Sequence, residues 1–140
     1  MGANYGSGSG QQVVTTEQGK TDNRTLWIVG AADRLNKPCR TGAPVKCGDS
    51  IRLEHTSTGK NLHSHSSVKG PISQRQEVSG FGDDGLGDAG DDWKIVCNER
   101  ADYGPTKKEG EKITGKDLFH LTHLETGCNL VSEQGYRFTN

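Results

Sequence analysis

A twelve-residue pattern occurs twice in this 140-residue chain and constrains its fold more than any other feature. Residues 53–64 read LEHTSTGKNLHS, and residues 121–132, which lie 68 positions later, read LTHLETGCNLVS. Seven of the twelve positions are identical. Self-similarity at a long fixed spacing is typical of repeat architectures, whose units bury a core only jointly. Because an enzyme site is usually a single asymmetric group of residues, the repeat favours a binding module.

Each copy of the pattern predicts a β-hairpin. Ile51, Leu53 and His55 alternate with polar residues, and residues 119–123 repeat this alternation. Such a period of two indicates a strand with one buried face. Each run then enters a polar turn that contains Thr-Gly, where glycine supplies the positive φ that a tight hairpin often requires. No long stretch shows a 3.6-residue period, so we expect little helix.

A second pair of matches completes the repeating unit. Gln12 begins a Gln-x-Val segment that is matched 64 residues later at Gln76, and the segment that begins at Trp27 is matched 66 residues later at Trp93. One unit therefore consists of a hairpin, a Gln-x-Val strand and a Trp strand, which makes about four strands. Tryptophan is the expected large buried anchor of each unit.

The composition is that of a strand-and-loop protein with a sparse core. Hydrophobic residues make up 29% of the chain, and there are twenty glycines. A net charge of -1 argues against a nucleic-acid-binding surface, which normally carries a basic patch. No run approaches the roughly 20 apolar residues of a membrane span. The first residues also lack the apolar centre of a signal peptide.

The four cysteines allow one short disulfide. Cys39 and Cys47 are separated by a seven-residue loop, which predicts a bridge between them, with free thiols as the alternative. Cys97 follows an apolar run and Cys128 lies in the second hairpin turn, and there is no Cys-x-x-Cys pair. Asn23 begins a glycosylation sequon, although such tripeptides often occur by chance. A disulfide and N-glycosylation would both suit an oxidising compartment of the secretory pathway.

Residues 48–65 resemble the MIR motif, which occurs in protein O-mannosyltransferases and in inositol-trisphosphate and ryanodine receptors. The residues on which this resemblance rests read GDSIRLxHxxTGxxLHSH. Within the MIR family, the chain is most similar to the proteins related to stromal cell-derived factor two. The similarity includes residues 5–12, the spacing of Cys39 and Cys47-Gly48, residues 76–82 and the Asp-Asp-Trp at 91–93. It extends from about Tyr5 to Gly135.

This resemblance implies a β-trefoil of three MIR repeats. It also implies a soluble, non-catalytic protein that lies in the lumen of the endoplasmic reticulum or is secreted. It also implies action with a chaperone or co-chaperone complex on unfolded proteins in quality control, related to O-mannosylation.

The chain is long enough for about two of the three units, within one domain spanning residues 1–140. Residues 11–29 match the second half of repeat 1, residues 43–97 match repeat 2, and residues 112–136 match the first half of repeat 3. We therefore expect an incomplete trefoil, cut from a longer protein. Exposed apolar strand faces would then lead the fragment to self-associate.

Three histidines and an acidic loop are candidates for metal binding. His63 and His65 lie on one face of a strand with His55 nearby, a set that can in principle bind zinc. The second copy, however, has Val131 at the position of His63, and no carboxylate is clearly placed as a further ligand. The sequence therefore predicts no metal site, and we expect His55 and His123 to bond the backbone of their turns.

The acidic, glycine-rich residues 83–92 offer oxygen ligands of the kind that calcium prefers. They lack the order of an EF-hand, so we expect a solvated loop in which Asp92 caps the Trp strand.

Catalysis has little support in the sequence. The Gly-Ser run at residues 6–10 contains the letters of a nucleophile elbow but not its strand–turn–helix context. We therefore expect no enzyme activity and no cofactor.

Two functions remain, of which the first is a protein-binding adaptor. The second is a lectin-like module that binds mannose-type glycans, with Tyr5, His63, His65 and Phe81 as ligand-binding candidates. An aromatic content of 6% weakens the carbohydrate alternative, because sugar sites need an exposed ring face.

Overall fold

A computed structural model describes residues 2–17, 19, 21–32, 42–84, 86–133 and 135. Its strands are β1 (Gln12–Val13), β2 (Trp27–Ala31), β3 (Ser50–His55), β4 (Asn61–Lys69), β5 (Gln76–Phe81), β6 (Trp93–Cys97) and β7 (Phe119–His123). The helical segments among these residues are two short 3-10 turns, η1 (Ala89–Asp91) and η2 (Ala101–Tyr103). The predicted all-β fold with little helix is confirmed. Within the described ranges, no helix has the length and apolar character needed to cross a membrane.

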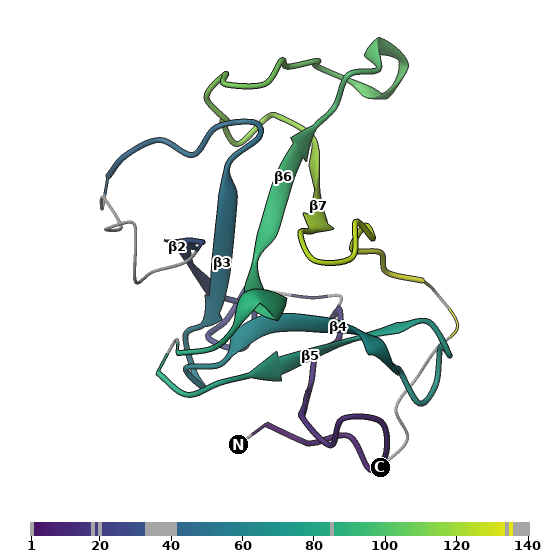
Figure 1. Ribbon diagram of the computed structural model, residues 1–140. Coiled ribbons are helices and arrows are strands. Elements are labelled where there is room, and N and C mark those ends of the chain that lie inside the picture. The colour runs from purple at the N-terminus through teal and green to yellow at the C-terminus, as the bar shows by residue number, and fades with distance from the viewer. Residues whose placement is uncertain are drawn as a thin grey trace.

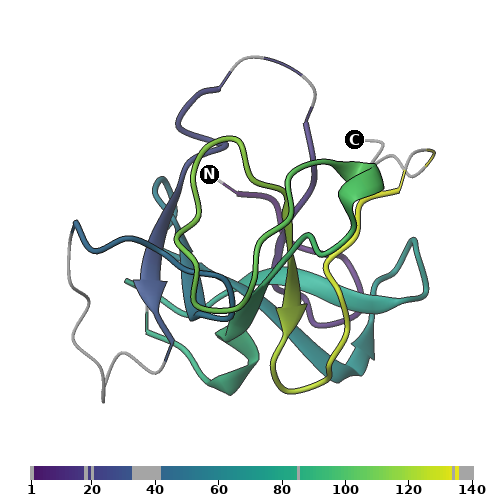
Figure 2. The same ribbon diagram turned by 90° about the horizontal axis from the view of Figure 1, so that it is seen from above.

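The strands form one open antiparallel sheet in the order β1-β5-β4-β3-β6-β7, and β2 also pairs with β3. In Figure 1, β3, β6 and β7 rise side by side, while β4 and β5 run across the lower part of the molecule. The long segment between β6 and β7 covers the upper end and faces the viewer in Figure 2. The closure of three units into a trefoil stays a prediction.

Both repeat copies form the predicted turn. Gly59 and Gly127 adopt positive φ angles of 64° and 69°. Their amides donate to the carbonyl oxygens of His55 and His123, at 2.9 and 2.8 Å. Because only glycine adopts this backbone conformation readily, the shared Thr-Gly pair fixes the same turn twice. The first turn leads into the nine-residue strand β4, whereas the second leads to a single bridge between Thr122 and Asn129.

Each Trp strand pairs with the hairpin that follows it in the chain. Trp27 is the register partner of His55, and Trp93 is the partner of His123. Their ring centroids lie 5.0 and 4.9 Å apart. Trp93 is the buried anchor that the sequence predicted, but Trp27 is only partly buried. The two copies therefore share the same strand pairing, but their tryptophans differ in burial.

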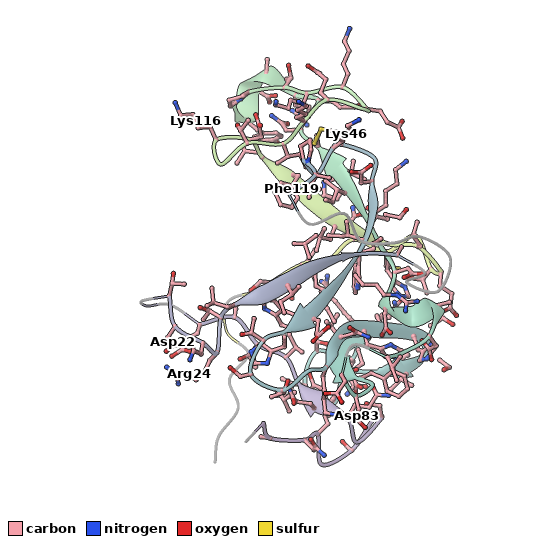
Figure 3. The ribbon with its side chains drawn as sticks, turned by 90° about the vertical axis from the view of Figure 1, so that its left-hand side faces the viewer. Asp22, Arg24, Lys46, Asp83, Lys116 and Phe119 are labelled. Atoms are coloured by element: carbon pink, nitrogen blue, oxygen red, sulfur yellow. A yellow bond between two sulfur atoms is a disulfide. The ribbon has the colours of Figure 1, made fainter. Side chains whose placement is uncertain are left out.

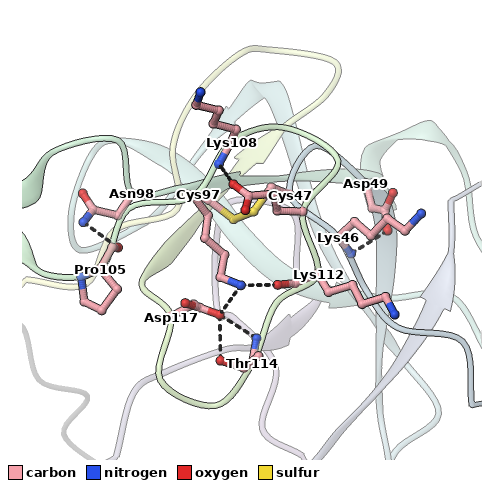
Figure 4. The surroundings of a disulfide bond; sticks show 12 residues. Lys46, Cys47, Asp49, Cys97, Asn98, Pro105, Lys108, Lys112, Thr114 and Asp117 are labelled. Atoms are coloured by element: carbon pink, nitrogen blue, oxygen red, sulfur yellow. Dashed lines mark hydrogen bonds and ion pairs between the residues drawn. A yellow bond between two sulfur atoms is a disulfide. The ribbon is translucent and has the colours of Figure 1, made fainter.

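The core gathers where β3, β4 and β6 meet. Its buried apolar residues are Cys47, Ile51, Leu62, Trp93, Ile95 and Cys97. Cys47 forms a disulfide with Cys97, with the Cα atoms 5.5 Å apart (Figure 4). The predicted bridge between Cys39 and Cys47 is therefore wrong, and Cys39 itself lies outside the described residues.

The physical reason for this disulfide is tertiary. Residue 47 lies just before β3 and residue 97 ends β6, and these antiparallel neighbours bring the two positions together. The amide of Gly48 donates to the carbonyl oxygen of Ile95 at 2.8 Å, which fixes this register. Cys128 is free and exposed.

The acidic loop and the segment between β6 and β7 lie at opposite ends of the molecule. In Figure 3, Lys46, Lys116 and Phe119 lie at one end, where the segment between β6 and β7 folds over the sheet, and Asp83 lies at the opposite end. The acidic loop therefore lies far from the disulfide, beside the turn of the first hairpin. Lys60 in that turn donates to the carboxylate of Asp83 at 3.0 Å.

Candidate functional site

The histidines of β4 form the first candidate site. His63 and His65 share one face of the strand, because alternate residues of a strand point the same way. The β4–β5 register pairs Asn61 with Phe81 and thereby places the Phe81 ring on this face. The ring centroid of His63 lies 4.5 Å from those of both Phe81 and His65. His63 is buried, while the side chain of His65 is 37% exposed.

The acidic loop folds over this histidine face. Asp91 is fully buried, and one of its carboxylate oxygens accepts from Nδ1 of His63 at 2.8 Å. The other oxygen accepts from the side-chain amide of Asn61 at 3.0 Å. Asp88 caps η1 by accepting from the amide of Gly90 at 2.8 Å. A Cβ on Gly90 would lie 2.6 Å from the His63 ring, so the loop packs directly on the imidazole.

The expectation of a solvated loop is therefore wrong for its last residues. Asp92 does not cap the Trp strand with its side chain; it forms an ion pair with the mostly buried Arg52, with Oδ1 and Nε 2.5 Å apart. Arg52 also donates to the carbonyl oxygen of Asp88 at 2.8 Å. These contacts fasten the loop to β3.

His65 lies between two carboxylates. Its Nε2 is 3.8 Å from Oδ2 of Asp88, and its Nδ1 is 3.7 Å from Oε2 of Glu125. Glu125 belongs to the turn of the second hairpin, so both repeat copies contribute to this cluster. Sequence reasoning missed Asp88, Asp91 and Glu125 as neighbours of the histidines. The Asp-Asp-Trp at 91–93 was the available signal, but it gave no indication of which side chain faces inward.

Tyr5 lies apart from the other three ligand-binding candidates. Its hydroxyl donates to the carbonyl oxygen of Val78 at 3.1 Å, on the face of the sheet opposite His63. Burial raises the pKa of Tyr5, and the negative charge of Glu77 raises it further. The hydroxyl thus stays protonated as a donor. The structure brings His63, His65 and Phe81 together but does not bring Tyr5 to them.

A cavity of about 950 Å³ on that opposite face is the second candidate site. Its walls come from the N-terminal segment, from strands β4, β5 and β6 and from the second hairpin, and they include Tyr5, Leu62, Gln76, Val78, Trp93 and Leu130. This volume is within the usual range of ligand pockets, which are mostly apolar with a few polar groups. Sequence reasoning found Tyr5 but not the cavity, because its lining residues are dispersed along the chain.

His55 and His123 stabilise the fold, as expected. They bond threonine side chains of their turns and distant carbonyl oxygens, whereas the sequence predicted bonds to the backbone of the turns. Nδ1 of each ring bonds the hydroxyl of a turn threonine, Thr58 or Thr126, at 2.9 Å. Nε2 bonds a distant carbonyl oxygen, that of Arg24 or of Gly90, at 3.0 Å. Both ring nitrogens are thus occupied, and His55 does not join His63 and His65 in a cluster.

The glycosylation candidate Asn23 is exposed, and its carbonyl oxygen accepts from Ser57 at 2.7 Å. Its modification stays a prediction. In the Gly-Ser run, Ser9 donates to the carboxylate of Glu77. The same hydroxyl accepts from the amide of Gln11 at 3.1 Å.

Comparison with known proteins identifies the family. The model of the MIR domain matches residues 2–136. The chain is 48% identical over 94 residues to human stromal cell-derived factor 2, a match that covers 67% of this chain and 43% of the relative. It spans about half the length, or less, of the curated relatives that it matches.

Two solved structures share the fold. The crystal structure of the SDF2-like protein from Arabidopsis thaliana matches with a TM-score of 0.76 and 38% identity, over 91% of this chain and 64% of that one. The S. cerevisiae protein O-mannosyltransferase Pmt1-Pmt2 complex bound to the sugar donor matches with a TM-score of 0.76 and 31% identity, over 94% of this chain and 18% of that one. The chain belongs to the MIR family and is similar to proteins named stromal cell-derived factor 2.

Proposed function

We propose that this MIR chain is a non-catalytic binding module of the endoplasmic reticulum lumen, where it acts with chaperones in protein quality control related to O-mannosylation. The observation that carries the proposal is the cavity of about 950 Å³ that Tyr5, β4, β5 and the second hairpin line. Its accessible apolar lining, Ile72, Val78 and Val131, suits the apolar side chains of an unfolded polypeptide. Tyr5 and Gln76 add polar groups that can orient a peptide backbone.

The chemistry of the chain supports the compartment and the absence of catalysis. The buried Cys47–Cys97 disulfide suits an oxidising lumen. Similarity to a part of the O-mannosyltransferase complex suits the same pathway. Of the histidines, His55, His63 and His123 each hold the fold together through at least one ring nitrogen, which leaves little general base chemistry on the described surface.

A lectin-like module is the second candidate. The observation that favours it is the partly exposed His65, which lies between two carboxylates and beside His63, since such polar groups can bond sugar hydroxyls. The packing of Phe81 against His63 counts against it, because that contact covers one face of the Phe81 ring.

The test measures binding of two probes, a fluorescent unfolded polypeptide and a mannose oligosaccharide. Ser132 is exposed at the cavity wall, so Ser132→Trp should obstruct the cavity without disturbing the core. Thr106→Trp, exposed in the segment between β6 and β7, is the matched control. We expect the first variant to weaken polypeptide binding about tenfold, or about 1.4 kcal/mol, and the control to leave it unchanged.

The two function classes give different outcomes. Mannose binding that Ser132→Trp leaves intact, without polypeptide binding, would favour the lectin. Binding of neither probe, or no co-purification with lumenal chaperones, would overturn the adaptor proposal. Co-purification that free mannose does not disturb supports it.

Self-association is a separate proposal about partners. Ile28, Phe119 and Val131 are large apolar residues that lie about half exposed or more. Because exposed apolar strand faces attract one another, copies of this chain should associate at high concentration. A monomer in light scattering at about millimolar concentration would contradict this expectation.

A further inference from the structure

The two histidines of β4 each have carboxylates beside their ring nitrogens. Nδ1 of His63 donates to the buried Asp91 at 2.8 Å, and Nδ1 of His65 faces Glu125 at 3.7 Å. In metal sites, a ligating histidine almost always donates its other ring N–H to a carboxylate or a carbonyl oxygen. In His63 the hydrogen bond to Asp91 places the proton on Nδ1 and leaves the lone pair on Nε2. The contact of His65 with Glu125 is too long for a hydrogen bond, and its Nε2 faces Asp88.

The Nε2 atom of His63 is buried and has no hydrogen-bond partner within the described part of the chain. An unsatisfied buried polar atom costs about 1–3 kcal/mol, so its presence calls for an explanation. The other nitrogens of the scaffold histidines are all satisfied, including Nε2 of His55 and of His123. The exception lies in the one histidine that has a second histidine and two aspartates beside it.

Asp88 supplies the third ligand. The oxygen that caps η1 lies 3.6 Å from Nδ1 of His63, and the other lies 3.8 Å from Nε2 of His65. One ligand atom from each of His63, His65 and Asp88 can be chosen so that all three lie within 4.8 Å of one another. We propose that these three residues bind a divalent transition-metal ion of the zinc class. Imidazole and carboxylate are ligands that zinc accepts, usually in tetrahedral geometry.

A small closure of the cluster completes the site. Zinc–ligand distances of about 2.0–2.2 Å place tetrahedral ligand atoms about 3.4 Å apart, so the side chains must approach by about 1 Å. The side chains of His65 and Asp88 are 37% and 48% exposed and have room to move, whereas His63 is fixed by Asp91. Water, or the carboxylate of Glu125 after a rotation, would fill the fourth position.

Such an ion would join three segments that the repeat brings together, namely β4, the loop before η1 and, through Glu125, the second hairpin. The second repeat copy has Val131 at the position of His63 and therefore cannot form an equivalent site. The structure thus assigns one ion per chain. The role is a structural staple between the units, and it is independent of ligand binding in the cavity on the opposite face.

The experiment titrates zinc alone into the metal-free chain by calorimetry. Cys128→Ser is the background, because the exposed thiol is itself a zinc ligand. We expect one zinc per chain and a higher melting temperature with zinc. His65→Gln and Asp88→Asn each remove a ligand and should weaken zinc binding by more than the roughly 10–100-fold that replacement of a ligand's supporting residue causes. Asparagine can still cap η1, so Asp88→Asn should fold.

His120→Gln is the matched control, since His120 is an exposed histidine on β7 outside the cluster. Its zinc affinity should equal that of the background protein. NMR of the unsubstituted chain adds a readout that needs no variant: zinc should shift the imidazole signals of His63 and His65 and leave those of His120 in place. Absence of zinc binding, equal loss in all three variants, or an unshifted His63 would overturn the proposal.

Discussion

The two copies of the repeated hairpin share their local contacts but differ in what covers them. In both copies a tryptophan pairs with the hairpin histidine, whose Nδ1 bonds the turn threonine and whose Nε2 bonds a distant carbonyl oxygen. The distances in the two copies agree to within 0.1 Å, since each Nδ1 contact is 2.9 Å and each Nε2 contact is 3.0 Å. A short identical sequence thus reproduces a complete hydrogen-bond network.

The likeness extends beyond the twelve residues. Gln12 donates to Thr58, and Gln76 donates to Thr126, so the glutamine of the Gln-x-Val strand reaches the next hairpin turn in both copies. Before each hairpin an aspartate accepts from the amide three residues earlier, Asp49 at 2.8 Å and Asp117 at 2.7 Å. These aspartates are 68 positions apart, the same spacing as the hairpins.

The difference lies in the return strand. In the first copy β4 pairs with β5 along much of its length, and Leu62 is 4% exposed. In the second copy the described residues after the turn make one bridge, and Leu130 is only partly buried. The sequence of a hairpin therefore fixes the conformation of its turn, whereas the burial of its return strand depends on the strand that pairs with it.

The largest expected difference in stability between the two copies comes from replacing their equivalent leucines. Leu62→Ala should lower the free energy of unfolding by about 2–5 kcal/mol, because it removes a buried side chain and leaves a cavity. Leu130→Ala, at the same repeat position, should cost less than about 1.5 kcal/mol. Denaturant unfolding of both variants measures the difference. Equal costs would show that the second return strand is as well packed as the first.

The disulfide gives the next largest effect, because it anchors the start of the first hairpin and the second copy has Gly115 at the equivalent position. Replacing Cys47 and Cys97 together by serine should lower the free energy of unfolding by about 2–4 kcal/mol. Cys128→Ser is the control and should stay within about 0.5 kcal/mol. A large effect of Cys128→Ser, or none of the double replacement, would refute this assignment.

The histidines test the shared network directly. His55→Ala and His123→Ala should each cost about 1–3 kcal/mol, since each leaves a threonine and a carbonyl oxygen without a partner. The cost should be higher for His123, which is fully buried, than for His55, which is 9% exposed. Thermal unfolding of the pair checks the order. A larger loss in His55→Ala would mean that burial does not set the strength of this network.

The smallest effect concerns Asp117 and depends on pH. Hydrogen bonds from Thr114, and also from Lys107, hold the pKa of Asp117 below its usual 3.8. A lowered folded-state pKa stabilises the protein above the unfolded pKa, and this stabilisation is lost as the pH falls through the folded-state value. Asp117→Asn should therefore destabilise the chain at neutral pH and match the parent in strong acid.

Melting curves of Asp117→Asn at about pH 7 and about pH 2 test that sign, with Asp49→Asn as the repeat-equivalent control. A deficit of Asp117→Asn that grows on acidification would contradict it.

Much of the fold was predictable because its signals are local. Alternation around Ile51 and the Thr-Gly pairs predicted the hairpins, and the spacing of Gln76 and Trp93 predicted the strands between them. The family motif lies in the same residues. Backbone conformation at a turn and the period of a strand depend on neighbouring residues, so a single sequence carries them.

The disulfide and the histidine cluster were decided by tertiary structure. Cys47 bonds Cys97 and not the nearby Cys39, because the β3–β6 register brings distant residues within reach. Asp91 is buried against His63 because the loop folds back over β4. The sequence alone determined the repeated hairpin and its family. Which strands pair, and hence which polar groups meet, depends on contacts between residues tens of positions apart, which no local pattern records.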